Sequence, residues 1–269
     1  MNFVKRMKRG IAAVLAFLMA MAGGFGAMAE EAAEETGLEN FPVYHGSRQS
    51  PKIALTVDDC NDRQIVLKCV ELCEKYGIAM TFFPNVNGVL TTGEAKGSLL
   101  REEDREIWRK VVDSGCEIGC HGYRHVKHNT NGIIVYSLMK FQEVLDQMLG
   151  YHYPYRWFRP PYGLESIMGD HGMRDSMITF KRCGYDHVML WDVSYMLDAQ
   201  GAFDRTQNGS ILLFHAREAD YECLEGLVPM LVEAGFERIS VDMGVYRRIY
   251  QEIDEFYNPA SIFTIAAWK

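Results

Sequence analysis

Positive charge is scarce in this 269-residue sequence, which has 28 Lys and Arg residues against 36 Asp and Glu residues and a formal net charge of −8. Four of the basic residues cluster within the first ten residues: Lys5, Arg6, Lys8 and Arg9. The chain after residue 29 therefore keeps 24 basic and 36 acidic residues, a net charge of −12. Such an acidic chain lacks the basic surface that binds nucleic acid or anionic lipid. We therefore expect no nucleic-acid partner.

Long apolar runs are also missing, apart from Ile11–Ala22 close to the start of the chain. A basic start, this apolar run and the small residues Ala27-Met28-Ala29 form the pattern of a secretory signal peptide over residues 1–29. The competing interpretation is an uncleaved anchor over Gly10–Ala29, although three glycines interrupt its second half. Both interpretations predict an exported protein, secreted or held at the cell surface, with membrane contact only if the segment stays uncleaved.

No cysteine spacing matches a zinc ribbon, although the chain has seven cysteines. An odd number in an exported chain leaves at least one thiol unpaired within the chain, and the disulfide state stays open. Most of these cysteines lie in apolar runs, so buried free thiols are expected. They are Cys60, Cys69, Cys73, Cys116, Cys120, Cys183 and Cys223.

Internal repeats and low-complexity segments are absent, and after a flexible lead-in over residues 30–48 we expect one domain over residues 49–269. Its short apolar runs alternate with amphipathic stretches, which indicates parallel strands covered by helices. Seven such units favour a distorted (β/α)7 barrel, an α/β fold similar to the TIM barrel. The expected strands are Ile53–Val57, Ile78–Phe83, Cys116–Cys120, Arg156–Phe158, His187–Trp191, Ser210–Phe214 and Arg238–Val241. The expected helices are Asp62–Tyr76, Glu102–Ser114, Ile133–Leu149, Met173–Cys183, Tyr221–Ala234 and Met243–Tyr257.

Polar residues gather where these strands end. The carboxyl ends of barrel strands meet on the face where barrel enzymes assemble their active sites, so the polar groups are expected to form one site. They are Asp58-Asp59, His121, the run Arg159-Pro160-Pro161-Tyr162-Gly163, Trp191-Asp192 and His215.

A metal site is predicted within this group. His121 and His125 are four residues apart, a spacing that lets two imidazoles share one ion on a helical turn. Histidines in a turn more often cap or hydrogen-bond, but the Asp58-Asp59 pair at the end of the first strand supplies a carboxylate as well. One carboxylate and two imidazoles leave a fourth position for water, as catalytic zinc sites do.

Residues 52–215 resemble, in order, the five motifs of the polysaccharide deacetylases. This is the NodB-homology family, also called carbohydrate esterase family four. Thr56-Val57-Asp58-Asp59-Cys60 resembles the first motif, T-F-D-D-G, and His121-Gly122-Tyr123-Arg124-His125 resembles the second, H-[ST]-x-x-x-H. Arg159-Pro160-Pro161-Tyr162-Gly163 resembles the third and Leu213-Phe214-His215 the fifth, L-x-H. The resemblance implies a barrel that removes N-acetyl or O-acetyl groups from an acetylated glycan.

The same resemblance implies a role for each matching residue. Asp59, His121 and His125 would hold a divalent metal, most simply Zn²⁺, with Co²⁺ or another divalent ion as alternatives. Asp58 would be the general base held by Arg159, and His215 the general acid. Substrate would meet the Tyr162 backbone N–H, which faces the oxyanion, together with Pro161, Leu213 and Trp191.

The sequence departs from the family at three positions. Cys60 stands where the first motif has glycine, either as a buried thiol or as a soft sulfur near the metal. Gly122 replaces the hydroxyl residue of the second motif. The fourth motif, which should end in Asp-Trp and supply the aspartate that orients His215, is eroded, and Asp198 is the expected substitute with Asp192 as the alternative.

Two other functions stay open from sequence alone. One is a glycan-binding module that has kept the fold without catalysis, and the other is a hydrolase of a small amide. The remaining histidines, His128, His152, His171 and His187, are expected in loops or on the surface.

Overall fold

A computed structural model of the chain describes residues 42–86, 88–89, 95–96, 104–155, 157–169, 172–185, 187–194 and 198–238. The expected signal peptide, most of the lead-in and the expected helix Met243–Tyr257 lie outside these residues. Within these ranges no helix combines the length and apolar character needed to cross a bilayer.

The strand β1, Lys52–Asp59, is the centre of the sheet. Its residues Ile53 to Asp58 are all buried, because parallel neighbours flank it and helices cover it. On one edge it pairs with β2, Thr81–Pro84, and β2 then pairs with β5, Glu117–Ile118. On the other edge it pairs with β8, Ile211–His215. The short strand β9, Glu237–Arg238, pairs with the first two residues of β1, on the edge opposite to β8.

The ring of strands closes through two further strands. β6, Trp157–Phe158, pairs in parallel with β7, His187–Val188. A parallel bridge between Cys120 and Phe158 joins the end of β5 to β6, and a second between Val193 and Leu212 joins the segment after β7 to β8. The predicted distorted parallel barrel is confirmed, and each of the seven expected strands has a counterpart among the described residues, although Arg156 and residues 239–241 of the expected strands lie outside them.

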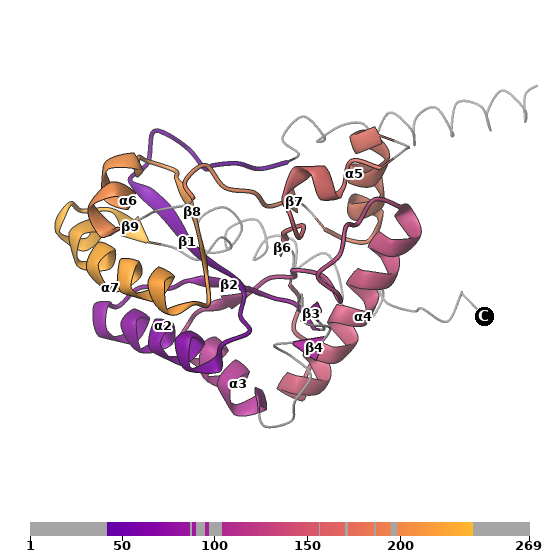
Figure 1. The fold of residues 1–269 in the computed structure, drawn as a ribbon, viewed down its shortest axis with the longest axis horizontal. Helices are drawn as coiled ribbons and strands as arrows, with labels where there is room; N and C mark the ends of the chain where they lie inside the picture. The colour runs from indigo at the N-terminus through magenta and orange to yellow at the C-terminus, as the bar shows by residue number, and fades with distance from the viewer. Residues whose placement is uncertain are drawn as a thin grey trace, which may run out of the picture. The chain divides into compact units, whose positions relative to one another are not determined.

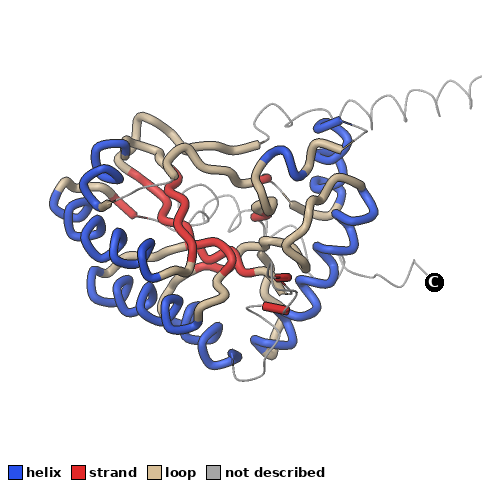
Figure 2. Tube along the Cα trace, in the orientation of Figure 1, coloured by secondary structure: helices blue, strands red, loops and turns tan. Residues whose placement is uncertain are grey.

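Helices cover the outside of the strands, as Figures 1 and 2 show. In the order in which they pack on one another they are α6 (Ala199–Arg205), α7 (Glu218–Glu233), α2 (Arg63–Tyr76), α3 (Arg105–Asp113), α4 (Asn131–Leu149) and α5 (Gly172–Arg182). Local signals fix their ends: Asp62 caps α2 by accepting from Gln64 N and Ile65 N, and Gly77 ends it with φ 60°. The sequence did not predict α6 or the antiparallel pair β3 (Gly88–Val89) and β4 (Ala95–Lys96).

The inside of the barrel is apolar below the site and polar at it. The apolar part is a cluster of five buried residues, each from a different strand or strand end: Ala54, Phe83, Trp157, Met189 and Ile211. Side chains alternate along β1, so those of Ala54, Thr56 and Asp58 share one face. The apolar layer thus leads directly to the first carboxylate of the Asp58-Asp59 pair.

Candidate metal centre and active site

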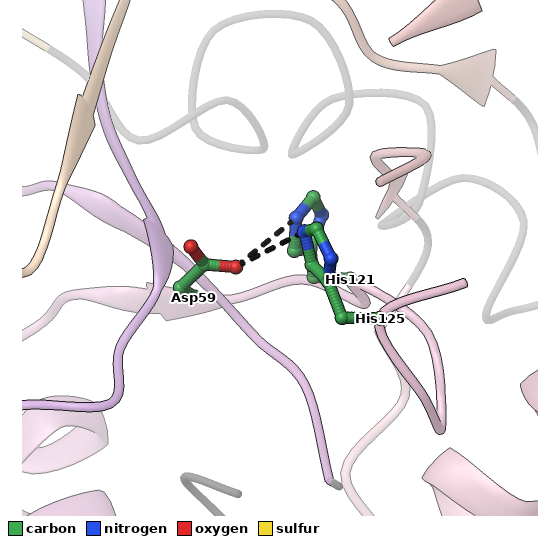
Figure 3. A group of neighbouring side chains, drawn as sticks. All are labelled: Asp59, His121 and His125. Atoms are coloured by element: carbon green, nitrogen blue, oxygen red, sulfur yellow. Dashed lines mark ion pairs between the residues drawn. The ribbon is translucent and has the colours of Figure 1, made fainter. Parts of the chain in front are cut away.

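Three side chains form a group suited to a metal ion. Asp59 Oδ1 lies 3.5 Å from His121 Nε2 and 3.4 Å from His125 Nε2, and the three donor atoms lie within 4.8 Å of one another. Figure 3 shows both imidazoles turned toward the carboxylate. Among the described residues this is the one such group of three or more His, Cys, Asp or Glu side chains.

The donor set fits a divalent metal. His121 Nδ1 lies 2.8 Å from the Arg159 carbonyl oxygen, which can accept only a hydrogen, so Nδ1 carries the proton and the Nε2 lone pair faces Asp59. Burial, reinforced by the neighbouring His121, lowers the pKa of His125 and keeps this ring in the neutral form that binds metals. One carboxylate oxygen and two neutral imidazole nitrogens match a three-ligand site with room for water.

The backbone turn at the end of β1 brings both aspartates into the site. Asp59 has φ 63° and Cys60 has φ 55°, and the Cys60 N–H donates to Asp58 O at 2.7 Å across this turn. Left-handed backbone at two successive non-glycine residues is strained, and such strain is typical of functional sites. The turn also places Asp59 beside Asn85, whose amide nitrogen lies 3.4 Å from Asp59 Oδ1.

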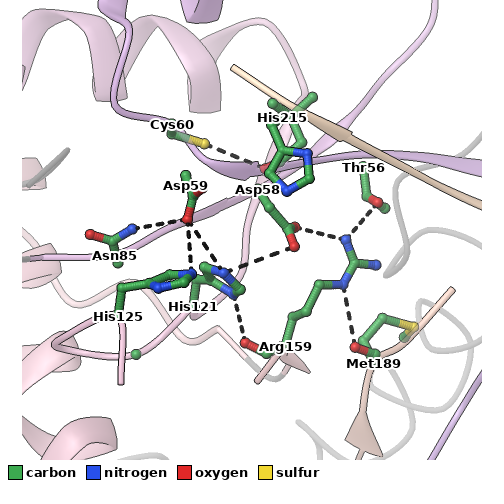
Figure 4. A network of polar contacts seen from close by, with 12 residues as sticks. Thr56, Asp58, Asp59, Cys60, Asn85, His121, His125, Arg159, Met189 and His215 are labelled. Atoms are coloured by element: carbon green, nitrogen blue, oxygen red, sulfur yellow. Dashed lines mark hydrogen bonds and ion pairs between the residues drawn. The ribbon is translucent and has the colours of Figure 1, made fainter. Parts of the chain in front are cut away.

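Asp58 belongs to a separate, fully buried ion pair. Its Oδ1 accepts from Arg159 Nη1 at 2.8 Å, while Oδ2 lies 4.0 Å from His121 Nε2 and so faces the group of three. The Arg159 side chain is 0% exposed and also donates to Thr56 Oγ1 and to two carbonyl oxygens, those of Met189 and Leu190. Figure 4 shows this guanidinium between Asp58, Thr56 and Met189, with dashed contacts to each. Burial lowers the pKa of Arg159 and Asp58 opposes that shift, so each charge is compensated by the other.

His215 enters from the other side of Asp58. It is the strand partner of Asp58 in the β1–β8 pairing, whereas His121 follows β5 on the opposite edge of β1. The carboxylate of Asp58 is therefore flanked by the group of three on one side and by His215 on the other, as Figure 4 shows. This arrangement separates two places where protons can be exchanged.

The third motif forms a tight turn over the site. Gly163 N donates to Pro160 O at 3.0 Å, and Tyr162 has φ 64°, a strained value for a non-glycine residue. The Tyr162 side chain is 62% exposed, and its ring packs edge-on against His125 at 4.7 Å between centroids. Pro161 is buried, and within the described chain no acceptor is found for the Tyr162 N–H.

The other two residues expected at the substrate lie close to these groups. Trp191 is half-buried, with its ring 5.7 Å from the Arg159 guanidinium, and its far edge lies 3.2 Å from where a side chain at Gly163 would begin. Leu213 is 6% exposed and pairs with Thr56 in the β1–β8 ladder, two residues before His215.

Comparison with known proteins agrees with this geometry. The family model described as polysaccharide deacetylase matches residues 45–176. This stretch belongs to the polysaccharide deacetylase family.

Similar proteins extend the match beyond that stretch. The uncharacterized protein YlxY of Bacillus subtilis is 24% identical over 210 residues, which cover 74% of this chain but only 59% of that protein. A peptidoglycan-N-acetylglucosamine deacetylase of Bacillus cereus is 24% identical over 202 residues, 72% of this chain and 68% of that one. The crystal structure of a carbohydrate esterase family four pseudoenzyme from Bacillus anthracis superposes with a TM-score of 0.59 at 20% identity, covering 74% and 67% of the two chains.

The structure explains two departures from the deacetylase motifs. Cys60 is 2% exposed and its thiol lies 3.4 Å from the Val57 carbonyl oxygen, while burial raises its pKa well above the ordinary value. The thiol is therefore neutral, and it is not part of the group of three around Asp59. Gly122 has φ 90°, and a Cβ there would lie 2.8 Å from the His128 ring, so the usual hydroxyl residue does not fit.

A hydroxyl from α4 braces the loop instead. Ser137 Oγ accepts from the Tyr123 N–H at 2.7 Å and lies 2.7 Å from His128 Nε2. His128 lies in a loop, as expected, but its side chain is not at the surface, since it is 0% exposed and packs against Phe158. Nothing in the sequence marks Ser137 as a functional residue, because a serine inside a helix usually takes part in neither binding nor catalysis.

The expected partner of His215 needs correction. Asp198 caps α6 by accepting from the Gly201 N–H at 2.7 Å, and Asp192 pairs with Arg48 at 2.6 Å while accepting from the Ile211 N–H. In the described part of the chain neither aspartate contacts His215. The carboxylate beside His215 Nδ1 is that of Asp220, at 3.4 Å.

Proposed function

We propose that this chain is a metal-dependent hydrolase that removes acetyl groups from an exported, acetylated glycan, with N-acetyl groups of peptidoglycan as the first candidates. The observation that carries the proposal is the juxtaposition of three side chains that could hold a metal ion with a buried, Arg159-held carboxylate and a histidine on its far side. The Bacillus cereus relative acts, by its name, on peptidoglycan N-acetylglucosamine.

Asp59, His121 and His125 are the proposed ligands, and Zn²⁺ is the ion that their donor types suit best. A bound ion of this kind would polarise the acetyl carbonyl and make a water molecule acidic enough to react near neutral pH. The chain's own contribution begins with Asp58. Its Oδ2 faces the ligand group while Arg159 holds Oδ1, which suits Asp58 to accept the proton of the attacking water.

The remaining residues act on the other side of the reacting carbon. The Tyr162 N–H can donate to the oxyanion that forms when water adds to the carbonyl. His215, across the β1–β8 ladder from Asp58, can give a proton to the departing amine nitrogen. Leu213, Pro161 and Trp191 supply apolar surface suited to an acetyl methyl group. The ligand group and His215 lie on opposite sides of Asp58, which supports this division between base and acid.

The export expected from the sequence supports a glycan outside the cytoplasm as the substrate. Residues 1–29 have the pattern of a signal peptide, and the acidic remainder disfavours nucleic acid as a partner. A binding module without catalysis remains the second candidate, because the similar Bacillus anthracis structure is that of a pseudoenzyme. The complete set of base, acid and metal-ligating side chains favours the hydrolase.

Acetate release tests the proposal. The purified chain without residues 1–29 is incubated with chitooligosaccharide, peptidoglycan and acetylated xylan, with and without added Zn²⁺ or Co²⁺. We expect metal-stimulated release from at least one substrate and its loss in Asp58→Asn. The matched control is Asp204→Asn on the exposed side of α6, which should keep full activity. Glycan binding without acetate release under any of these conditions would favour the binding module.

A further inference from the structure

His215 is surrounded by a group of charged residues that no family motif contains. β8 ends at His215, and α7 begins three residues later at Glu218, so the first turn of α7 folds back toward the ring. Asp220 in this turn accepts the His215 backbone N–H at 2.6 Å, and its Oδ2 lies 3.4 Å from His215 Nδ1. The same carboxylate therefore contacts both the backbone and the ring of one residue.

Arg217 completes the group. Its guanidinium lies 2.8 Å from His215 Nδ1 and 3.1 Å from Asp220 Oδ2. The Arg217 side chain is 65% exposed, whereas those of His215 and Asp220 are 29% and 21% exposed. The other acidic group of this turn, Glu218, pairs with Lys68 at 2.7 Å on α2.

We propose that Asp220 is the positioning residue of His215, replacing the aspartate that the eroded fourth motif fails to provide. This inference rests on the proposed function, in which His215 is the proton donor. It assigns to the start of α7 a task for which the sequence suggested Asp198 or Asp192, and both of those carboxylates are engaged elsewhere.

The chemistry of the ring requires such an acceptor. A neutral ring can accept from Arg217 at Nδ1, but a protonated ring carries hydrogens on both nitrogens and then repels the guanidinium. Asp220 Oδ2 is the acceptor within reach of that Nδ1 hydrogen, and Arg217 is exposed enough to move into water. The 3.4 Å separation is long for a hydrogen bond, as catalytic contacts often are before substrate binds.

Asp220 stays ionised while the His215 ring gains and gives up its proton. Burial raises the pKa of its carboxyl, but the contacts with the His215 ring, the hydrogen bond from the His215 backbone N–H and the Arg217 charge together outweigh burial, and the pKa lies below its ordinary value. The proton given to the departing amine comes from His215 Nε2, and the ring is left neutral with its remaining hydrogen on Nδ1. Asp220 neither gains nor loses a proton, so it orients the ring and stabilises its charged form.

The first test needs no activity. Nuclear magnetic resonance of ¹⁵N-histidine-labelled protein is recorded for the wild type, Asp220→Asn and the control Glu222→Gln, an exposed carboxylate two residues along α7. Asparagine can still accept the His215 backbone N–H, so Asp220→Asn removes the charge with the least disturbance of the fold. We expect the Nδ1 resonance of His215, assigned by its loss in His215→Ala, to shift in Asp220→Asn and to stay in place in Glu222→Gln. An unchanged resonance in Asp220→Asn would overturn the proposal.

The second test is kinetic. Acetate release by Asp220→Asn should show kcat lowered about 10–100-fold with KM and metal content unchanged, the usual effect of losing a hydrogen bond to a charged group. In the His215→Ala background the same change should cost nothing further, because Asp220 acts through that ring. Losses that multiply in full in the double variant would overturn the proposal. A wild type that releases no acetate would refute the proposed function, while the resonance experiment would still decide the pairing.

Discussion

Replacing Arg159 should reveal how strongly the site depends on one buried ion pair. The guanidinium is 0% exposed, donates to Asp58, Thr56 and two carbonyl oxygens, and lies 4.3 Å from the centre of the Phe83 ring. Arg159→Met removes every one of these hydrogen bonds and leaves the Asp58 carboxylate buried without a counter-charge. Breaking a buried pair on one side typically costs about 3–5 kcal/mol of unfolding free energy.

Two further variants separate charge from geometry. Arg159→Lys keeps a positive charge near Asp58 but loses the planar fork that reaches the Met189 and Leu190 carbonyl oxygens, so we expect a loss of about 2 kcal/mol from two hydrogen bonds. The double variant Arg159→Met, Asp58→Asn removes the uncompensated charge. It should be more stable than the sum of the two single losses predicts, by about 1–3 kcal/mol.

Urea denaturation of the wild type, the three single variants and the double variant measures these free energies. An unfolding free energy of Arg159→Met within about 0.5 kcal/mol of the wild type would contradict a stabilising ion pair, and so would losses of Arg159→Met and Asp58→Asn that simply add. Additive losses would mean that the cost of Arg159→Met comes from its packing against Phe83 and its other hydrogen bonds, and not from the ion pair.

Three other predictions concern the metal site and its loop. Asp58→Asn should keep the metal and lose turnover, whereas Asp59→Asn should lose both, as paired metal analysis and rate measurements can check; the reverse pattern would exchange their roles. Ser137→Ala should weaken Zn²⁺ affinity about 10–100-fold in a chelator competition, because the Tyr123 N–H loses its acceptor, while the control Ser176→Ala, whose hydroxyl bonds the Ile167 carbonyl, should bind normally. Burial lowers the pKa of His128 to about 4 from 6.5, so the unfolded chain binds a proton between these values that the folded chain excludes. Metal-free protein should therefore lose up to about 3 kcal/mol of stability as the pH falls from 6.5 to 4, and denaturation of His128→Gln should lack that part of the loss; an unaltered pH dependence would contradict the assignment.

The sequence predicted the barrel because apolar strands and capped helices carry their signals locally. The strands β1 and β8 are buried apolar runs that end in polar residues of the site. The helix α2 begins after a capping aspartate and ends at a glycine. The two-residue strands are harder, since their pairing is decided by the closure of the ring. The bridge from Val193 to Leu212, which completes that ring, has no sequence pattern of its own.

The carboxylate beside His215 could not be predicted from the local sequence pattern. An aspartate before a helix is an equally good sign of an N-cap, and Asp198 serves as one at the start of α6. Acidic residues in the first turn of a helix are common because they favour its dipole, so Asp220 looked ordinary. Only the fold of the chain between β8 and α7 brings that carboxylate to the ring.

The most direct test of the metal-dependent hydrolase is a titration. Metal-free protein without residues 1–29 receives increasing Zn²⁺ while acetate release from the best glycan substrate is followed. We expect the rate to rise and saturate near one ion per chain, and the His121→Ala, His125→Ala double variant to stay folded and inactive at every ratio. Acetate release that persists in excess chelator, or that survives in the double variant, would contradict it.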